Sequence, residues 1–271
     1  MHKAGGGAGL RDTRTIIDLT ITAYSSDESE STMGAASDSF FKQVCMAQIK
    51  LLLFSGFETT STATCYHLYL LAQYPEVMAR VRKEHDAVFG SDTSTTAAMI
   101  SSSPHLLNQL PLTTAVIKES LRLYSTVTPS RQGEWGFCII YKEGRSFPTA
   151  DLMVLPCTLS IHNDPLFWPQ PGAFIPDRFL VGPDHPLHPV KGAWRGFEHG
   201  PRNCIGQELA MLEMKVVLVL ASRTYDLESA YDELDNKAGR EQPSLQGEKA
   251  YQVDILQPRG NLPMRVTKLH A

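Results

Sequence analysis

The sequence is poor in cysteine, and its cysteines are not arranged in pairs. Only five occur in 271 residues, and no two of them form a C-x-x-C motif. Disulfide-stapled domains and structural zinc sites depend on paired, closely spaced cysteines, so neither is indicated, and a reducing compartment is the expected setting. The five positions are Cys45, Cys65, Cys138, Cys157 and Cys204.

Long apolar segments and blocks of one charge are also missing. The longest apolar runs are about six residues, for example 216–221, whereas a membrane-spanning helix needs about 20. Residues 1–14 contain no apolar core of a signal peptide. The net charge is −4 without a polybasic block, which argues against a nucleic-acid partner. No G-x-G-x-x-G motif lies between a strand and a helix, so no flavin or nicotinamide site is expected.

The sequence does contain an ordinary globular composition and one long helical segment. Hydrophobic residues make up 42% of the chain and charged residues 20%. A helical pattern runs from Asp38, a candidate N-cap, to Gln73, which corresponds to about 54 Å. It is apolar around much of its circumference near residues 51–57, as is typical of a helix through the middle of a large protein. Pro75 ends this helix and opens the next.

The rest of the chain predicts shorter helices and a small sheet, so the expected fold class is mainly α with a small β-sheet (α+β). Residues 1–12 are rich in glycine and are expected to be a flexible N-terminus, and residues 13–271 are expected to belong to a single domain. Residues 161–203 are dense in proline, glycine and aromatic residues and form a long irregular segment, which is usually functional. Helices are predicted at 13–24, 75–89, 113–124 and 206–223, loops at 25–37 and 90–103, and strands within 127–160, at 251–256 and at 263–267.

The segment FEHGPRNCIG, from Phe197 to Gly206, carries the strongest chemical signal. Cys204 lies just before an apolar helix, where backbone N–H groups and the helix dipole favour a negatively charged sulfur. The glycines permit a tight loop, and Arg202 adds a fixed positive charge suited to carboxylates. These features indicate a cysteine thiolate that binds a ligand. For a cysteine taken alone, a buried structural role is the more common alternative.

The spacing F-x-x-G-x-R-x-C-x-G in this segment resembles the haem-binding loop of the cytochrome P450 family. Ala210, four residues after Gly206, also matches that family. The resemblance implies a haem cofactor, with Cys204 as the thiolate ligand of the iron and therefore as the metal-binding residue. It also implies that Arg202 holds a haem propionate, that Phe197 packs near the sulfur, and that Gly206 belongs to the cofactor-binding loop.

The middle of the long helix, SGFETT at residues 55–60, matches a second segment of that family. The family places an acid and an alcohol over the distal face of the haem, where they relay protons to iron-bound oxygen. The resemblance gives this catalytic role to Glu58 and Thr59. Ser55 replaces the small apolar residue that is more usual, and Gly56 marks a place where the helix can open or kink. The alternative is an ordinary helix whose hydroxyl groups bond carbonyls one turn earlier.

A third match is Glu119-x-x-Arg122, whose spacing puts both charges on one face of a helix. The motif alone is weak because such short patterns arise by chance. In the family, this pair locks to a later arginine and holds the proximal side of the fold. Arg178, in the segment PDRF at 176–179, matches that arginine, so the resemblance implies a structural role for all three residues.

Two weaker matches concern Arg131 and His162. The family often has a propionate-binding residue at the position of Arg131, while an exposed surface arginine is an equally good interpretation. His162 lies in a segment that resembles the family's connection before the PDRF segment. It is expected to hold loop backbone rather than a metal ion.

The resemblance covers residues 13–270 with the motifs in the family's order, and it is greatest to fungal members. It implies a partial cytochrome P450 fold that lacks the N-terminal half, so that 13–271 is the C-terminal part of one haem-binding domain. A full-length parent would reside at the endoplasmic reticulum membrane. This chain is expected to have no membrane anchor and to be cytoplasmic if expressed alone.

The implied activity is a haem-dependent monooxygenase that inserts one oxygen atom from O2 into a small apolar organic substrate, in fungal secondary or xenobiotic metabolism. Its electrons would come from NADPH-cytochrome P450 reductase or a similar donor. Two alternatives belong to other classes. The chain is a truncated, catalytically incompetent fragment that at most binds haem, or a cytosolic helical protein whose Cys204 alkylates readily and on which haem has no effect.

Overall fold

The structure is a computed structural model that describes residues 35–237 and 258–269, and its chain divides into two units, 1–55 and 56–271. Of the first unit, the described part is the N-terminal portion of helix α2 (Ala35–Gln73), which ends in the second unit. The expected flexible N-terminus at 1–12, the helix at 13–24 and the strand at 251–256 lie outside the described residues.

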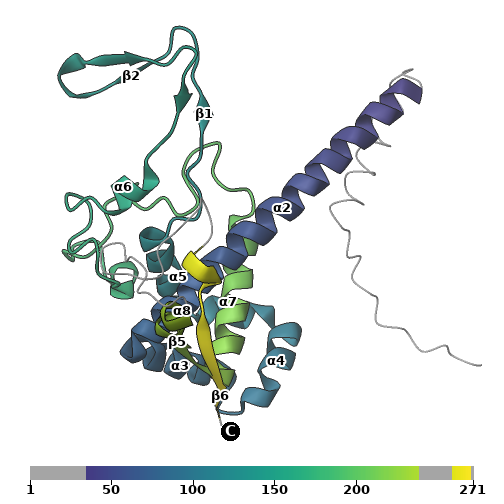
Figure 1. The fold of residues 1–271 in the computed structure, drawn as a ribbon, viewed down its shortest axis with the longest axis vertical. Coiled ribbons are helices and arrows are strands. Elements are labelled where there is room, and N and C mark those ends of the chain that lie inside the picture. Colours follow the sequence, from purple (N-terminus) through teal and green to yellow (C-terminus); the bar gives the residue numbers. More distant parts are fainter. Residues whose placement is uncertain (1–34, 238–257, 270–271) are drawn as a thin grey trace, which may run out of the picture. The chain divides into compact units, whose positions relative to one another are not determined.

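The second unit is mainly helical, as expected, and its strands form small sheets (Figure 1). The helices after α2 are α3 (Pro75–Phe89), α4 (Thr96–Ser102), α5 (Pro111–Leu123), α6 (Thr158–His162), α7 (Gln207–Thr224) and α8 (Tyr231–Lys237). Short 3-10 turns are η1 (Thr93–Thr95), η2 (Pro104–Gln109), η3 (Lys142–Gly144), η4 (Pro176–Phe179) and η5 (Arg259–Asn261). The strands are β1 (Arg131–Gln132), β2 (Cys138–Ile140), β3 (Ser146–Pro148), β4 (Met153–Val154), β5 (Tyr225–Ser229) and β6 (Met264–Lys268).

The predicted helices at 75–89, 113–124 and 206–223 are confirmed to within two residues at each end. Asp38 lies inside α2, so its assignment as the N-cap is wrong. The predicted loop at 90–103 is also wrong, because η1 and α4 occupy most of it. Met99 and Ile100 of α4 pack against the buried side chain of Val219 and its neighbours, and this contact outweighs the low helix propensity of the serines and threonines.

The strands form three separate antiparallel pairs among the described residues, rather than one small sheet. Strand β1 pairs with β4, β2 with β3, and β5 with β6. The strand predicted at 263–267 is confirmed as β6, and its partner β5 and helix α8 were not predicted. In the register of β5 and β6, Leu227 lies opposite Val266.

The core of the second unit is built mainly from α2, α3, α5 and α7. Each contributes apolar side chains that are at most 1% exposed, such as Leu71, Val81, Val116 and Leu218. Helices α3, α5 and α7 all contact one another (Figure 1). This packing fixes α7, whose N-terminal end follows the Cys204 segment, against α5.

The N-terminus of α5 is closed by a carboxylate from α3. Glu84 accepts the backbone N–H groups of Leu112 and Thr113 at 2.7 and 2.9 Å, and the hydroxyl of Thr113 donates to it at 2.7 Å. These are N–H groups that a helix leaves unsatisfied, and a negative charge at this end also suits the helix dipole. Glu84 therefore ties the start of α5 to α3.

The other end of α5 carries the expected buried charge cluster. Glu119 accepts two hydrogen bonds of 2.8 Å from Arg122 and one of 3.1 Å from the Nε of Arg178, and all three side chains are 0% exposed. A buried ion pair is tolerated when its remaining donors are satisfied. Arg122 donates its other N–H groups to the carbonyl oxygens of His162, Pro171 and Ala173.

We predict that Glu119→Gln lowers the free energy of unfolding by about 3–5 kcal/mol. The substitution keeps the shape of the side chain, but it leaves the charges of Arg122 and Arg178 buried without a counter-charge. Urea denaturation followed by circular dichroism measures the change.

Asp177→Asn is the matched control. It breaks the ion pair between Asp177 and Arg80, in which the arginine side chain is 46% exposed and the aspartate side chain 41%. The free energy of unfolding should therefore fall by less than about 1 kcal/mol. If Glu119→Gln costs no more than Asp177→Asn, the buried cluster does not have the stabilising role described above.

Candidate functional site

The Cys204 segment forms a loop that is closed by its own backbone hydrogen bonds. The N–H of Cys204 donates to the carbonyl of Phe197 at 2.9 Å, and the N–H of Asn203 donates to that of Gly200 at 3.1 Å. Gly200 has φ +85°, a conformation that L residues rarely adopt. Helix α7 begins three residues after Cys204, at Gln207. The loop therefore presents an exposed cysteine just before helix α7, which buries one side in the core.

Aromatic side chains fix this loop on α5. The indole Nε1 of Trp194 donates to the carbonyl of Lys118 at 2.9 Å, and its ring lies 6.2 Å from that of Phe197, centroid to centroid. A Cβ at Gly196 would lie 2.5 Å from the Trp194 ring, so any larger residue there must displace the indole. Phe197 packs against the main core while its carbonyl holds the N–H of Cys204.

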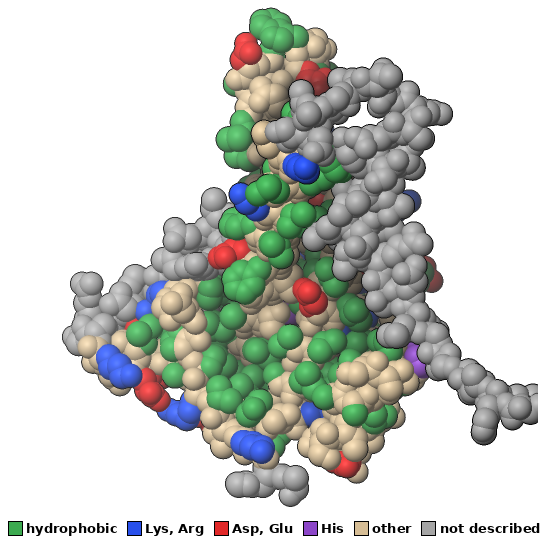
Figure 2. All heavy atoms as spheres, turned by 90° about the vertical axis from the view of Figure 1, so that its right-hand side faces the viewer, with side chains coloured by type: hydrophobic (Ala, Val, Ile, Leu, Met, Phe, Trp, Pro, Cys, Tyr) green, Lys and Arg blue, Asp and Glu red, His purple; other side chains and the backbone are tan. Residues whose placement is uncertain are grey.

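The residues around the sulfur have the chemistry that a haem needs. Cys204 offers a soft sulfur donor, and Arg202 is exposed and suited to a carboxylate. Ile205 and Leu209 expose 94% and 61% of their surface, although both are large and apolar. Figure 2 shows hydrophobic side chains gathered over much of one face of the molecule. Exposed apolar surface is typical of an interaction site, and Ile205 and Leu209 are neighbours of Cys204 in the sequence.

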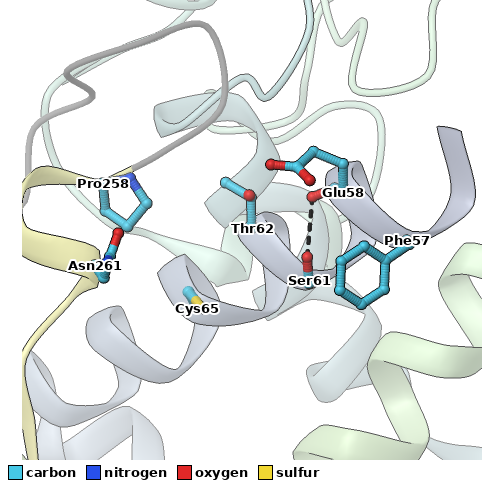
Figure 3. A pocket seen from close by; sticks show the side chains of 7 residues that line it. All are labelled: Phe57, Glu58, Ser61, Thr62, Cys65, Pro258 and Asn261. Carbon is cyan, nitrogen blue, oxygen red and sulfur yellow. Dashed lines mark hydrogen bonds between the residues drawn. The ribbon is translucent and has the colours of Figure 1, made fainter. Parts of the chain in front are cut away.

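Glu58 lines an open pocket of about 270 Å³ on the second unit (Figure 3). Phe57 and Cys65 of α2 line it too, and Pro258 and Asn261 close the opposite side. Cys204 and Arg202 are not among its lining residues.

The helix around Glu58 has no break, since α2 is continuous through Ser55 and Gly56. The hydroxyl of Ser61 donates to the carbonyl of Glu58 at 3.1 Å, and that of Thr64 donates to the carbonyl of Thr60 at 2.8 Å. Both hydroxyls lie just after the segment 55–60, so these bonds do not test the alternative interpretation of the polar residues within it. Thr59 is half-buried, and its role in proton transfer stays a prediction.

The family model described as Cytochrome P450 matches residues 8–255 of the chain. The chain belongs to the cytochrome P450 family. It is 40% identical to "Cytochrome P450 monooxygenase polC" of Polytolypa hystricis, over 92% of this chain and 46% of that protein. It is 34% identical to "Cytochrome P450 monooxygenase acrF" of Aspergillus aculeatus, over 97% of this chain and 57% of that protein.

The fold is likewise similar to a solved cytochrome P450. The structure titled "Retinoic acid bound cyanobacterial CYP120A1" has a TM-score of 0.62 and 28% sequence identity, covering 82% of this chain and 45% of that one. The chain thus spans about half the length of the curated relatives named above and of this structure. Family and fold class are confirmed, including the resemblance to fungal members. No helix among residues 35–237 and 258–269 is long and apolar enough to cross a membrane.

Arg131 lies on β1 of this cytochrome P450, where its side chain is exposed. Its Nη1 donates to the carbonyl of the preceding residue, Ser130, at 2.9 Å. Both the propionate-binding role and the surface role remain compatible with this position, so the assignment of Arg131 stays a prediction.

His162 holds backbone, as expected from the sequence. Its Nδ1–H donates to the carbonyl of Arg122 at 3.1 Å, and its Nε2 accepts the backbone N–H of Arg195 at 2.9 Å. Because one ring nitrogen must donate and the other must accept, these partners require the neutral imidazole. Burial, followed by the charge of Arg122, lowers the pKa of His162 to about 4.

Two other buried histidines were not singled out from the sequence. Burial lowers the pKa of His67, which lies against the sulfur of Met214 at 3.0 Å, to about 3. Burial and the charge of Arg223 lower that of His85 to about 4. The hydroxyl of Thr113 uses its proton to donate to Glu84. The Nε2–H of His85 must therefore donate to the oxygen of that hydroxyl, at 2.8 Å. No local pattern signals these roles, because each partner is distant in the chain.

These three histidines predict a loss of stability in mild acid. Each has a folded-state pKa below the value of about 6.5 expected in the unfolded chain, so below pH 6.5 the unfolded state binds protons first. The free energy of unfolding should fall by about 2 kcal/mol per histidine between pH 6.5 and 5, and the effect levels off below the folded pKa values. Urea denaturation at several pH values measures the slope.

His67→Leu should reduce this slope by about a third, because it removes one of the three groups. The exposed His105 is the matched control, and His105→Gln should leave the slope unchanged. An equal slope in wild type and His67→Leu would contradict the assignment of His67 as a buried neutral group.

Proposed function

We propose that this cytochrome P450 chain serves a haem-dependent monooxygenase that inserts one oxygen atom from O2 into a small apolar organic substrate, in fungal secondary or xenobiotic metabolism. The observation that carries the proposal is the exposed sulfur of Cys204. It stands in a loop closed by the bond from the Cys204 N–H to the Phe197 carbonyl, at 2.9 Å, in a chain of this family.

The proximal residues divide the work of holding the cofactor. Cys204 would bind the iron as a thiolate, and Arg202 and Arg131 would bind the propionates through their guanidinium groups. Phe197 would keep the loop in place, and Gly206 would belong to the cofactor-binding loop, where a Cβ would make an ordinary van der Waals contact with the sulfur at 3.9 Å. When bound through a thiolate, haem supplies the chemistry of O–O cleavage.

On the distal side, Glu58 and Thr59 would deliver protons. Glu58 borders an open pocket, so its carboxylate can exchange protons with solvent, and Thr59 follows it on α2. A carboxylate and a hydroxyl at this spacing can pass a proton inward from bulk water. The electrons would come from NADPH-cytochrome P450 reductase or a similar donor, and a full-length parent would work at the endoplasmic reticulum membrane.

A second candidate function is haem binding without turnover by the chain alone. It is supported by the large exposed fraction of apolar side chains on α2, for example 74% for Phe57. A haem that is open to water lacks the dry pocket that controls oxygen chemistry.

The experiment is a carbon monoxide difference spectrum. The chain is expressed with haem supplied, reduced, and exposed to carbon monoxide. We expect the red-shifted Soret band that is typical of a thiolate ligand, because the loop already presents Cys204 to the solvent.

Cys204→Ala should abolish that band, while Cys157→Ala, at another exposed cysteine, should retain it. A thiolate-type band that survives in Cys204→Ala would overturn the assignment of the ligand. A band in wild type without product from any apolar substrate in the presence of a reductase would favour haem binding without turnover.

A further inference from the structure

Glu198, within the Cys204 loop, adopts a backbone conformation that is unfavourable for its residue type. Its φ is +60°, in the left-handed region where a side chain meets its own carbonyl and where glycine is at ease. A non-glycine residue stays in this region only where its surroundings hold it there. The use of glutamate therefore directs attention to what its side chain contacts.

The carboxylate of Glu198 is held from two sides. Its Oε2 accepts from Arg195 Nη1 at 2.7 Å, with side chains that are 13% and 31% exposed for glutamate and arginine. Its Oε1 accepts from the hydroxyl of Thr158 at 3.2 Å, and Thr158 is 1% exposed. The first contact is charge-assisted and partly shielded from water, so it is stronger than a surface ion pair.

These contacts continue into the core through His162. The N–H of Arg195 donates to His162 Nε2 at 2.9 Å. His162 in turn is joined to Arg122 in both directions, by its Nδ1–H to the Arg122 carbonyl at 3.1 Å and by Arg122 Nη1 to the His162 carbonyl at 2.8 Å. An unbroken series of hydrogen bonds thus leads from the buried Glu119 cluster to Glu198.

The series ends beside the atom that positions the sulfur. Glu198 follows Phe197, whose carbonyl accepts the Cys204 N–H at 2.9 Å. The rotation of the peptide between these two residues sets the direction of that carbonyl. Holding Glu198 therefore holds the acceptor for Cys204.

We propose that Glu198 is a positioning residue for Cys204, and that Arg195 and His162 connect it to the buried cluster. The role rests on the proposed function insofar as Cys204 binds haem iron. The fixed Phe197 carbonyl would keep the Cys204 sulfur in one position relative to the start of α7, so that the thiolate would stay bound to the iron when the haem is reduced.

The test compares Glu198→Gly with Glu143→Gly in the full chain. Glu143 is also a glutamate with positive φ, +63°, and it is exposed on η3, away from the Cys204 loop in sequence. Both substitutions relieve the same backbone conformation, but only the first removes contacts to Arg195 and Thr158. Amide hydrogen exchange at Cys204 is measured without and with added haem, together with the fraction of the reduced carbon monoxide complex that shows the thiolate-type band.

Glu198→Gly should accelerate exchange of the Cys204 amide on the order of tenfold and lower the thiolate-type fraction below about half, whereas Glu143→Gly should match wild type. Glu198→Gln, which keeps an acceptor for Thr158, should lie between them. Unchanged exchange at Cys204 in Glu198→Gly would overturn the proposal. So would an acceleration that is equal in α3, α5 and the loop, because that indicates a general loss of stability.

The two proposals fail in different ways. If wild type shows no thiolate-type band, the proposed function fails, and the exchange of the Cys204 amide in the haem-free chain still decides whether Glu198 positions the loop. If the band is present and Glu198→Gly leaves both its fraction and the exchange unchanged, only the positioning role is wrong.

Discussion

The carboxylate of Glu119 is shielded from water and paired with two equally buried arginines, so the segments that carry these side chains cannot separate without leaving a charge unpaired in the core. Arg122 extends this constraint to α6 and to the irregular segment after it, because its guanidinium binds the carbonyl oxygens of His162, the last residue of α6, and of Pro171 and Ala173. The backbone hydrogen bonds within this segment, which is rich in proline and glycine, are mainly those of short turns, so the bonds from Arg122 add a long-range constraint on its course.

The Cys204 loop depends on the same constraint. His162 accepts a hydrogen bond from the backbone N–H of Arg195 and so connects the loop to the buried cluster. Trp194 provides a second attachment, because its indole N–H donates to the carbonyl of Lys118 on α5. The loop is thus attached to α5. It continues directly into α7, which also packs on α5. A rigid base with an exposed sulfur is what a metal ligand requires, since a ligand that moves by an ångström no longer binds in the same geometry.

The distal and proximal residues differ in how strongly the structure constrains them. The loop around Cys204 is defined by several hydrogen bonds and by the ring contact between Trp194 and Phe197, whereas Glu58 borders an open pocket. Large apolar side chains on α2 and α7 face solvent, among them Phe57 and Leu209. Apolar surface of this extent favours a bound apolar group, and a haem would cover part of it.

The sequence by itself determined helices α3, α5 and α7 and the position of the cysteine loop before α7. Proline at 75, the helical periodicity and the spacing around Cys204 are local signals, and the structure has the corresponding elements within two residues. The pairing of Glu119 with Arg122 also follows from helical spacing. Only the tertiary structure decided the strand partners, helix α4, the buried histidines and the contacts of Glu198. Helix α4 depends on Val219 and Glu198 depends in part on Thr158, both of which are distant in the chain, and no local pattern encodes which distant residues will meet.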